Sequence, residues 1–190
     1  MTTPEHERAR SPLDRLWAGW RTAYMDEVTV ADRADRPATG DGEGHGSVFT
    51  RILRAIDAGD LTDEAAYLVH RGDHAFAILN AYPYGTGHLL VMPYREVGAL
   101  EDLTGDESAD VWRLVNQAVR AIKAAYRPEG VNVGFNLGRA AGAGVPTHVH
   151  GHVLPRWDAD SNFMTTIAEA RVLPEPLSVT WEKLRRAWPS

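Results

Sequence analysis

The pattern of apolar and polar positions predicts one long amphipathic helix over residues 104–126. Thr104 and Glu107 have the spacing of a capping box, which satisfies backbone N–H groups at the start of a helix. Pro128 lies just beyond the last apolar position, where the helix is expected to have ended. The apolar stripe that should face the core consists of Val111, Leu114, Val115, Ala118, Val119, Ile122 and Tyr126.

The same spacing predicts two shorter helices. Residues 48–58 carry apolar side chains every three or four positions, at Phe49, Ile52, Leu53 and Ile56. Gly59 is a suitable end for this helix, because glycine readily adopts the left-handed conformation found at helix C-termini. Residues 177–188 form the second helix, with apolar positions at Val179, Trp181, Leu184 and Trp188.

Between these helices, short apolar runs bounded by turn residues predict β-strands. Residues 71–73, with the sequence Arg-Gly-Asp, form a hairpin-like turn between the first two runs. The predicted strands are Ala65–His70, Ala75–Asn80, Leu89–Met92, Val131–Leu137 and Thr147–Leu154. Together with the long helix they predict one α+β domain, built on a mostly antiparallel sheet with N- and C-terminal extensions.

Composition narrows the classes of function. The 190 residues are 44% apolar and 24% charged, which is the balance of a soluble globular protein. The net charge of −6 gives no reason to expect a nucleic acid as partner. The lack of cysteine excludes disulfides and thiolate metal ligands. Since no apolar run has the length of a membrane span and the first residues lack a signal-peptide core, we expect a cytoplasmic protein without a membrane partner.

His148, His150 and His152 occupy every second position of the last predicted strand. Alternate side chains of a strand point to one face, so the three imidazoles are expected side by side. This pattern indicates either metal binding or chemistry on phosphate. Same-face positions lie roughly 6.5–7 Å apart, which makes three histidines in line a poor chelate for one ion. At a phosphate site, a neutral imidazole acts as nucleophile when a backbone carbonyl holds its other ring N–H.

A glycine-rich segment, Gly138–Gly144, precedes the histidines. Its unobstructed backbone N–H groups are suited to an anion-binding nest. It lacks the Gly-Lys-Ser/Thr ending of a P-loop and is not interpreted as one. Arg139 is a candidate phosphate clamp by charge alone, with a solvent-exposed side chain as the alternative.

Three segments together resemble the histidine triad (HIT) superfamily of nucleotide hydrolases and transferases. They are Asn80–Pro93, Asn136–Gly144, and the histidine triplet with the Val153-Leu154 that follows it. Segments that resemble the actinobacterial diadenosine tetraphosphate (Ap4A) phosphorylases of this superfamily lie at residues 14–17, 136–139, 154–157 and 162–164. The resemblance implies a HIT-like fold with its core at residues 48–157. The remainder is divided into a flexible tail (1–12), an N-terminal extension and loop (13–47) and a C-terminal extension (158–190).

The resemblance also implies a catalytic role for each histidine. His150 is the expected nucleophile, which attacks the α-phosphorus of a nucleotide and forms a nucleotidyl-histidine intermediate. His152 and His88 are expected to contact the phosphate. His148 belongs to the same group of candidates, although its role is less defined.

Substrate contacts are implied by the resemblance as well. Asn80 occupies the position that binds ribose hydroxyls, and Asn136 is expected beside the phosphates together with the backbone of Gly142, Gly144 and Val145. The implied partners are a nucleotide substrate, adenine being favoured, and inorganic phosphate or water as acceptor. A homodimer or a larger homo-oligomer is also implied.

At the position of a metal site, the chain departs from the HIT pattern. Many HIT proteins hold a structural metal with a Cys-x-x-Cys pair, a histidine after the second strand and the first triad histidine. Here Ser47, Thr50 and Glu96 stand where three of those ligands are expected. We therefore predict no structural zinc and no cofactor, which leaves His148 available for hydrogen bonding.

Gly151 is a second departure, since the phosphorylase relatives typically have glutamine there. Glycine inside a strand often marks the close approach of a ligand or of backbone, and a glutamine here would contact a phosphate or a leaving group. Three hypotheses follow. They are an enzyme acting on a dinucleoside polyphosphate or on a nucleotide intermediate of a specialised pathway, a nucleotide-binding protein with weakened catalysis, and a metalloenzyme with His88, His148, His150 and His152 as ligands.

Overall fold

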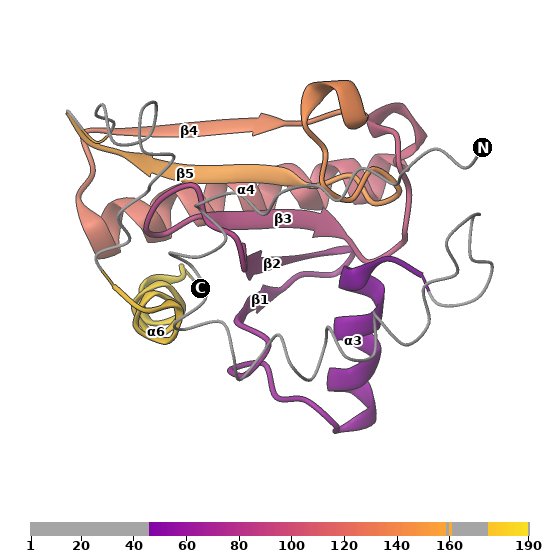
Figure 1. The fold of residues 1–190 in the computed structure, drawn as a ribbon, viewed down its shortest axis with the longest axis horizontal. Coiled ribbons are helices and arrows are strands. Elements are labelled where there is room, and N and C mark those ends of the chain that lie inside the picture. Colours follow the sequence, from indigo (N-terminus) through magenta and orange to yellow (C-terminus); the bar gives the residue numbers. More distant parts are fainter. Residues whose placement is uncertain (1–45, 159, 161–174, 190) are drawn as a thin grey trace, which may run out of the picture. The chain divides into compact units, whose positions relative to one another are not determined.

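The computed structural model describes residues 46–158, 160 and 175–189 (Figure 1). All of these except Asp160 belong to one compact unit, formed by residues 42–158 and 173–190. The predictions for residues 1–45, which include the tail and the motif at 14–17, lie outside the described residues, and so does the motif at 162–164. The organisation of the whole chain as a single domain stays a prediction.

Five strands form one antiparallel sheet in the order β1-β2-β3-β5-β4. The edge strands are β1 (Leu68–Arg71) and β4 (Gly130–Phe135), and β2 (Ala75–Leu79) pairs with β1 through the predicted hairpin. Next to β2 lies β3 (Leu89–Pro93), which also pairs with β5 (Gly151–Arg156). The α+β fold with an antiparallel sheet, as predicted, is confirmed.

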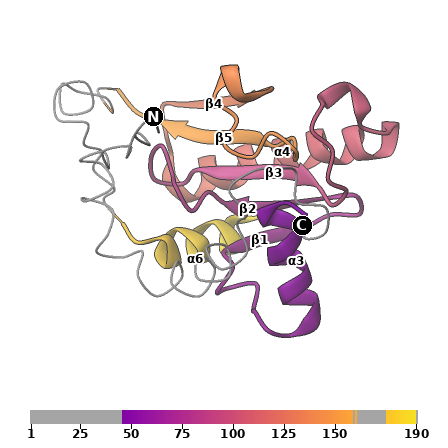
Figure 2. The ribbon, with the colours of Figure 1, turned by 45° about the vertical axis from the view of Figure 1, so that its right-hand side comes forward.

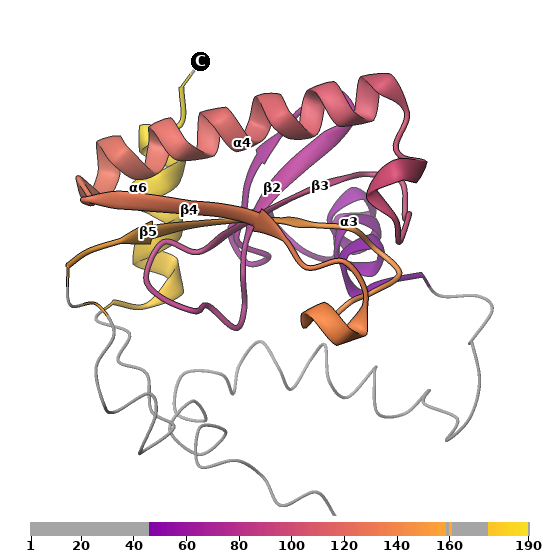
Figure 3. The same cartoon turned by 90° about the horizontal axis from the view of Figure 1, so that it is seen from above.

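One face of the sheet is covered by the long helix α4 (Gly105–Tyr126), and Figure 3 shows α4 on one side and η2 (Arg139–Ala141) on the other. The helix packs through the predicted stripe, in which Leu114, Ala118 and Ile122 have no exposed surface. Because side chains alternate along a strand, every second residue of the sheet faces this helix. These residues include Ala75, Ala77, Leu79, Leu89, Val91 and Val153.

The opposite face is partly covered by α3 (Val48–Ala58). Its buried side chains Phe49, Ile52 and Leu53 form a second apolar cluster with the alternate residues of β1, β2 and β3, namely Leu68, Phe76, Ile78, Leu90 and Met92. The helix ends at Gly59, which has a left-handed φ of 84°, and its predicted bounds are confirmed. On β5, His152 points to this second face, because Val153 faces α4.

The start of α4 is fixed by the predicted capping box. The Thr104 hydroxyl accepts the Glu107 N–H at 3.2 Å, and the Glu107 carboxylate accepts the Thr104 N–H at 2.9 Å. Arg95 donates to both oxygens of the same carboxylate, at 2.8 and 2.7 Å. These hydrogen bonds from Arg95 lower the pKa of Glu107 to about 2, against the opposing effect of burial. The cap therefore joins α4 to the segment that leaves β3.

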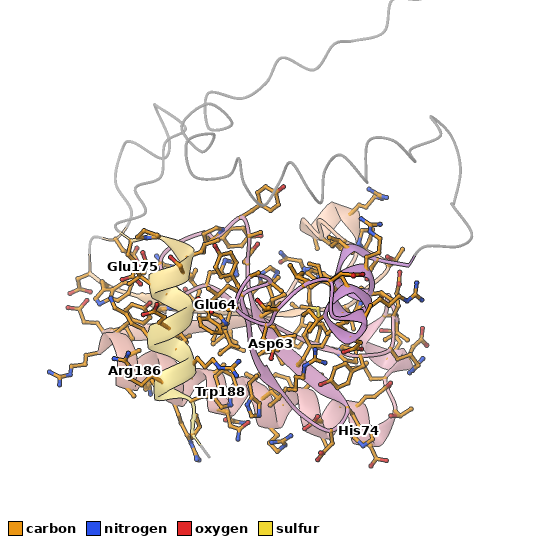
Figure 4. All side chains as sticks on the ribbon, turned by 90° about the horizontal axis from the view of Figure 1, so that it is seen from below. Asp63, Glu64, His74, Glu175, Arg186 and Trp188 are labelled. Carbon is orange, nitrogen blue, oxygen red and sulfur yellow. The ribbon has the colours of Figure 1, made fainter. Side chains whose placement is uncertain are left out.

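At the β1 end of the sheet lies α6 (Leu177–Ala187), close to the predicted range, and Figure 2 shows α6 and α3 at this end with β4 at the other. Leu184 is fully buried, and the Trp181 indole N–H donates to the Leu68 carbonyl at 2.8 Å. Figure 4 shows Glu175 and Arg186 near opposite ends of this helix. Val179 was predicted in the apolar stripe but is 37% exposed, because the buried positions are Leu177, Thr180 and Leu184.

Two predicted strands begin later than expected. The run Ala65–His70 contains a turn, in which Tyr67 has a left-handed φ of 57°, and β1 therefore starts at Leu68. The strand predicted over Thr147–Leu154 starts only at Gly151. Pro93 ends the neighbouring strand without an N–H to donate, so the ladder between β3 and β5 stops there. No helix in the described part of the chain is long and apolar enough to span a bilayer.

Candidate active site

All four predicted histidines come together where β5 begins. His148 and His150 directly precede β5, His152 lies in it, and His88 directly precedes the neighbouring β3. The ring centroids of His150 and His152 are 5.1 Å apart, and those of His152 and His88 are also 5.1 Å apart. The expectation of three imidazoles on one regular strand is wrong for His148 and His150, yet the rings still form a continuous group.

His150 is held by the backbone just before it. Its Nδ1 lies 2.7 Å from the His148 carbonyl oxygen, which only accepts, so Nδ1 carries the proton and donates. In the neutral ring Nε2 is then unprotonated. Among the described residues Nε2 has no hydrogen-bond partner, and it is not one of the fully buried atoms. The ring therefore has the tautomer that a nucleophile needs, with its lone pair accessible.

Hydrogen bonds also fix the tautomer of His152. The Tyr84 N–H donates to Nδ1 of His88 at 3.0 Å, so the proton of neutral His88 is on Nε2. That Nε2 lies 2.9 Å from Nδ1 of His152, which must accept, and neutral His152 then carries its proton on Nε2. The Asn136 atom nearest this nitrogen, at 3.3 Å, is the side-chain Nδ2, which only donates, so Asn136 accepts the Nε2–H only with its amide turned to present the oxygen. His152 thus presents an N–H donor, and His88, only 1% exposed, lies behind it.

Burial keeps the imidazoles of His148, His150 and His152 neutral. Desolvation lowers the pKa of His148 and of His150 below 6.5. Burial, with a smaller contribution from His150, lowers the pKa of His152 to about 4. Near pH 7 the group is therefore a set of uncharged donors and acceptors, which suits nucleophilic attack by His150.

The glycine-rich segment lies beside Asn136. Gly142 has a left-handed φ of 93°, and a Cβ there would be 3.9 Å from the Asn136 amide nitrogen. Within residues 46–158, 160 and 175–189, the backbone N–H groups of Gly144 and Val145 have no acceptor. The structure thus leaves two N–H groups free in the segment predicted to bind phosphate.

Of the remaining predicted contacts, Asn80 lies against a histidine and Arg139 does not. The Asn80 side-chain oxygen accepts the Tyr82 N–H at 2.9 Å, and its nitrogen is 3.3 Å from His88 Nδ1. Arg139 is exposed on η2, and no contact in the described part of the chain joins it to an imidazole. The same part contains no group of three or more His, Cys, Asp or Glu side chains arranged to hold a metal ion.

Comparison with known proteins identifies the family of the chain. The HIT domain family matches residues 62–159, and AP-4-A phosphorylase of Mycobacterium tuberculosis is 41% identical over 94% of this chain and 86% of its own length. The chain belongs to the HIT family. Bis(5'-adenosyl)-triphosphatase of Saccharomyces cerevisiae is 36% identical over 46% of this chain and 43% of its own length.

Solved HIT structures have the same fold. A zinc-bound histidine triad family protein of Mycobacterium smegmatis is similar with a TM-score of 0.57 and 28% identity, over 72% of this chain and 91% of that chain. A histidine triad nucleotide-binding protein of Sulfolobus tokodaii has a TM-score of 0.56 and 26% identity, over 70% of this chain and 88% of that chain. These likenesses agree with the antiparallel sheet described above.

Gly151 of the HIT triad has a structural explanation that the sequence did not provide. A Cβ at this position would lie 2.8 Å from Cζ of Phe135, its cross-strand neighbour on β4. The close approach is therefore made by an aromatic ring, and not by a ligand or by backbone as expected. Position 151 points to the α4 face, away from His152, so a side chain there starts on the far side of the sheet from the imidazoles.

On the imidazole face, the HIT site is open beside His152. The cross-strand neighbours of His152 are Leu90 and Gly134. A Cβ added to Gly134 would have no atom of the described residues within 4 Å. The absence of a side chain on β4 at this point leaves room next to the His152 N–H.

Two aromatic residues border the HIT histidines, and the sequence reasoning assigned neither to the site. Phe49 of α3 contacts the rings of His148 and His150, with centroid distances of 5.6 and 5.5 Å. Tyr84 stacks on His152 at 5.5 Å and lies 4.5 Å from His88. Phe49 was predicted only as a helix core residue. The signal for Tyr84 was an aromatic residue in a turn four positions before His88.

Proposed function

We propose that this protein cleaves a phosphoanhydride bond of a dinucleoside polyphosphate by nucleotidyl transfer, with His150 as nucleophile. The observation that carries the proposal is the hydrogen bond from His150 Nδ1 to the His148 carbonyl at 2.7 Å. It leaves an unprotonated and accessible Nε2 in a ring that burial keeps neutral. The 41% identity with AP-4-A phosphorylase over most of both chains supports the same substrate class.

The proposed reaction on Ap4A has two displacements. Nε2 of His150 attacks the α-phosphorus, the bond to the bridging oxygen breaks, ATP leaves, and AMP stays bonded to Nε2. An oxygen of inorganic phosphate then attacks the same phosphorus, the P–N bond breaks, and ADP is released. With water as acceptor the second product is AMP. Phosphate is the acceptor that we propose, by similarity to the phosphorylase.

The other residues bind and orient the phosphate. His152 donates its Nε2–H to a phosphate oxygen in the space beside Gly134, and the N–H groups of Gly144 and Val145 donate to others. His88 acts through His152, because both of its ring nitrogens are already engaged. Asn80 and Arg139 stay candidates for the ribose and for the outer phosphates.

The proposal is tested by incubating the protein with Ap4A, with and without inorganic phosphate, and separating the products by anion-exchange chromatography. We expect ATP and ADP with phosphate. We expect His150→Ala to lose about 10³-fold or more of kcat while it still binds AMP, since the nucleophile is gone and the fold is kept. His74→Ala, a change of an exposed histidine outside the site, is the matched control.

Two results would contradict the proposal. One is turnover by His150→Ala, which would remove the assigned nucleophile. The other is tight binding of AMP by the unmodified protein without cleavage of Ap4A at high enzyme concentration, which would favour the nucleotide-binding alternative.

A further inference from the structure

Behind His148, four polar side chains form a hydrogen-bonded group that the catalytic proposal does not use. Ser47 and Thr50 lie at the start of α3, Glu96 lies in the segment after β3, and His148 is the first triad position. We call these four residues the Ser47 cluster. The Ser47 hydroxyl lies 2.8 Å from His148 Nδ1, and the Ser47 N–H donates to Glu96 at 2.6 Å. The Thr50 hydroxyl donates to the same Glu96 oxygen at 3.0 Å.

The two ring nitrogens of His148 and the Glu96 carboxylate each have a hydrogen-bond partner of the matching kind. The Pro93 carbonyl, 2.9 Å from His148 Nε2, only accepts, so Nε2 carries the proton. His148 Nδ1 then accepts the Ser47 O–H. Burial alone would raise the pKa of Glu96, but the hydrogen bonds from Ser47, Thr50 and Thr147 outweigh it and lower this pKa. Glu96 is therefore an ionised acceptor near pH 7.

This cluster occupies the positions at which many HIT proteins hold a metal, but its chemistry does not fit a zinc site. The donors are two neutral hydroxyls, one carboxylate and one imidazole, without any thiolate. Both ring nitrogens of His148 are already engaged, one by a hydroxyl and one by a carbonyl. Glu96 Oε2, His148 Nδ1 and the hydroxyls of Ser47 and Thr50 instead have hydrogen-bond partners within the cluster.

The cluster is connected directly to His150. His148 has no exposed surface, and both sides of its ring are held, so the position of its backbone is fixed. Its carbonyl is the acceptor for His150 Nδ1–H. Phe49, two residues after Ser47, contacts both imidazoles. A displacement of His148 therefore moves the acceptor that determines the tautomer of His150.

We propose that Ser47, Thr50 and Glu96 are positioning residues for His150, and that their hydrogen bonds do this without a metal ion. The cluster orients His148, and the His148 carbonyl keeps the proton on Nδ1 of His150 and the lone pair on Nε2. This inference rests on the proposed function for its kinetic consequence. Its structural consequence, the tautomer of His150, is measurable without any substrate.

The test uses the full chain with Ser47→Ala and Glu96→Gln, each with a matched control. Ser47→Ala also removes the N-cap of α3, so its control is Thr104→Ala, which removes the N-cap of α4. Glu96→Gln is matched by Asp110→Asn, a buried carboxylate that accepts the backbone N–H groups of His74 and Ala75. Kinetics are measured with Ap4A and phosphate well below each melting temperature, and histidine tautomers by NMR of protein labelled with 15N-histidine.

We expect kcat to fall about 10-fold or more in both cluster variants while KM changes less than about twofold, because the nucleophile is misplaced and the binding groups are kept. The NMR signals should show a loss of the Nδ1–H form of His150. The controls should lower the melting temperature yet keep kcat and the His150 tautomer. Ser47→Thr, which keeps the hydroxyl, should have the kcat and the His150 tautomer of the unmodified protein.

Folded cluster variants with the kcat and the His150 tautomer of the unmodified protein would overturn the inference. So would stoichiometric zinc in the purified protein whose removal by a chelator changes that tautomer. If the unmodified protein cleaves no Ap4A, the proposed function fails, and the NMR comparison still decides whether the cluster positions His150. If one variant does not fold, the other retains both measurements.

Discussion

Phe135 and Gly151 are cross-strand neighbours on the α4 face of the sheet. The Phe135 ring occupies the space that a side chain at position 151 would fill, with Cζ 2.8 Å and Cε1 3.0 Å from the position of a Cβ. The ring also contacts Trp112 of α4 edge-on, at 5.9 Å. The absence of a side chain at Gly151, between two triad histidines, is thus coupled to the packing of Phe135 beneath β5. A substitution at one of these two positions is therefore expected to require a change at the other.

This coupling predicts the effect of restoring glutamine at position 151. Gly151→Gln should lower the free energy of unfolding by about 1–3 kcal/mol, because Phe135 has to move. Phe135→Ala should lower the free energy of unfolding less in the Gly151→Gln variant than in the unmodified protein. A double-mutant cycle measured by urea unfolding detects this non-additivity. Gly130→Gln on β4 is the control, since a Cβ there is in ordinary contact at 3.8 Å. Additive costs would contradict the coupling.

At the scale of elements, Glu107 joins α4 to the segment after β3 by accepting from Thr104 and Arg95. Glu107→Gln should lower the free energy of unfolding by about 1 kcal/mol at pH 7. The pKa of Glu107 is lowered to about 2, so its contribution is complete above pH 4.5 and is lost as the pH falls toward 2. In urea unfolding, the difference in free energy of unfolding between Glu107→Gln and the unmodified protein should be smaller at pH 3 than at pH 7. Glu101→Gln, an exposed carboxylate, is the control, and a difference independent of pH would contradict the assignment.

The sequence predicted those elements whose signals are local. The bounds of α3 and the cap of α4 follow from an apolar stripe, a capping pair and a glycine stop, all within a few residues. The start of β5 was missed because it depends on Pro93, which is distant in sequence and ends the partner strand. The triad pattern likewise indicated a nucleophile. The burial of His88 and the hydrogen-bond partners of His148 were not predicted, because they depend on contacts between residues 64 and 101 positions apart in the sequence.

At the scale of the whole molecule, folding buries three triad imidazoles in neutral form. The pKa values of His148, His150 and His152 are lowered below 6.5, that of His152 to about 4. The unfolded chain therefore binds protons below pH 6.5 that the folded protein does not yet bind. Homo-oligomerisation, which bears on the same measurements, stays a prediction.

We accordingly expect the free energy of unfolding to fall as the pH is lowered from 6.5 to about 4, since these histidines favour the folded state only while neutral. Urea unfolding between pH 4 and pH 8 measures this slope. His152→Asn should reduce it, whereas His74→Asn, at an exposed position, should leave it unchanged. An unchanged slope in the His152 variant would refute the assignment.

The hydrogen bond between His150 Nδ1 and the His148 carbonyl also determines the regiochemistry of the proposed intermediate. With Nδ1 occupied, the P–N bond forms at Nε2 alone, so the adduct is a single positional isomer. Once Nε2 is bonded to phosphorus, the ring carries a positive charge until Nδ1 loses its proton. The carbonyl that selected the tautomer then faces that charge, and it stabilises the cationic leaving group on which the second displacement depends.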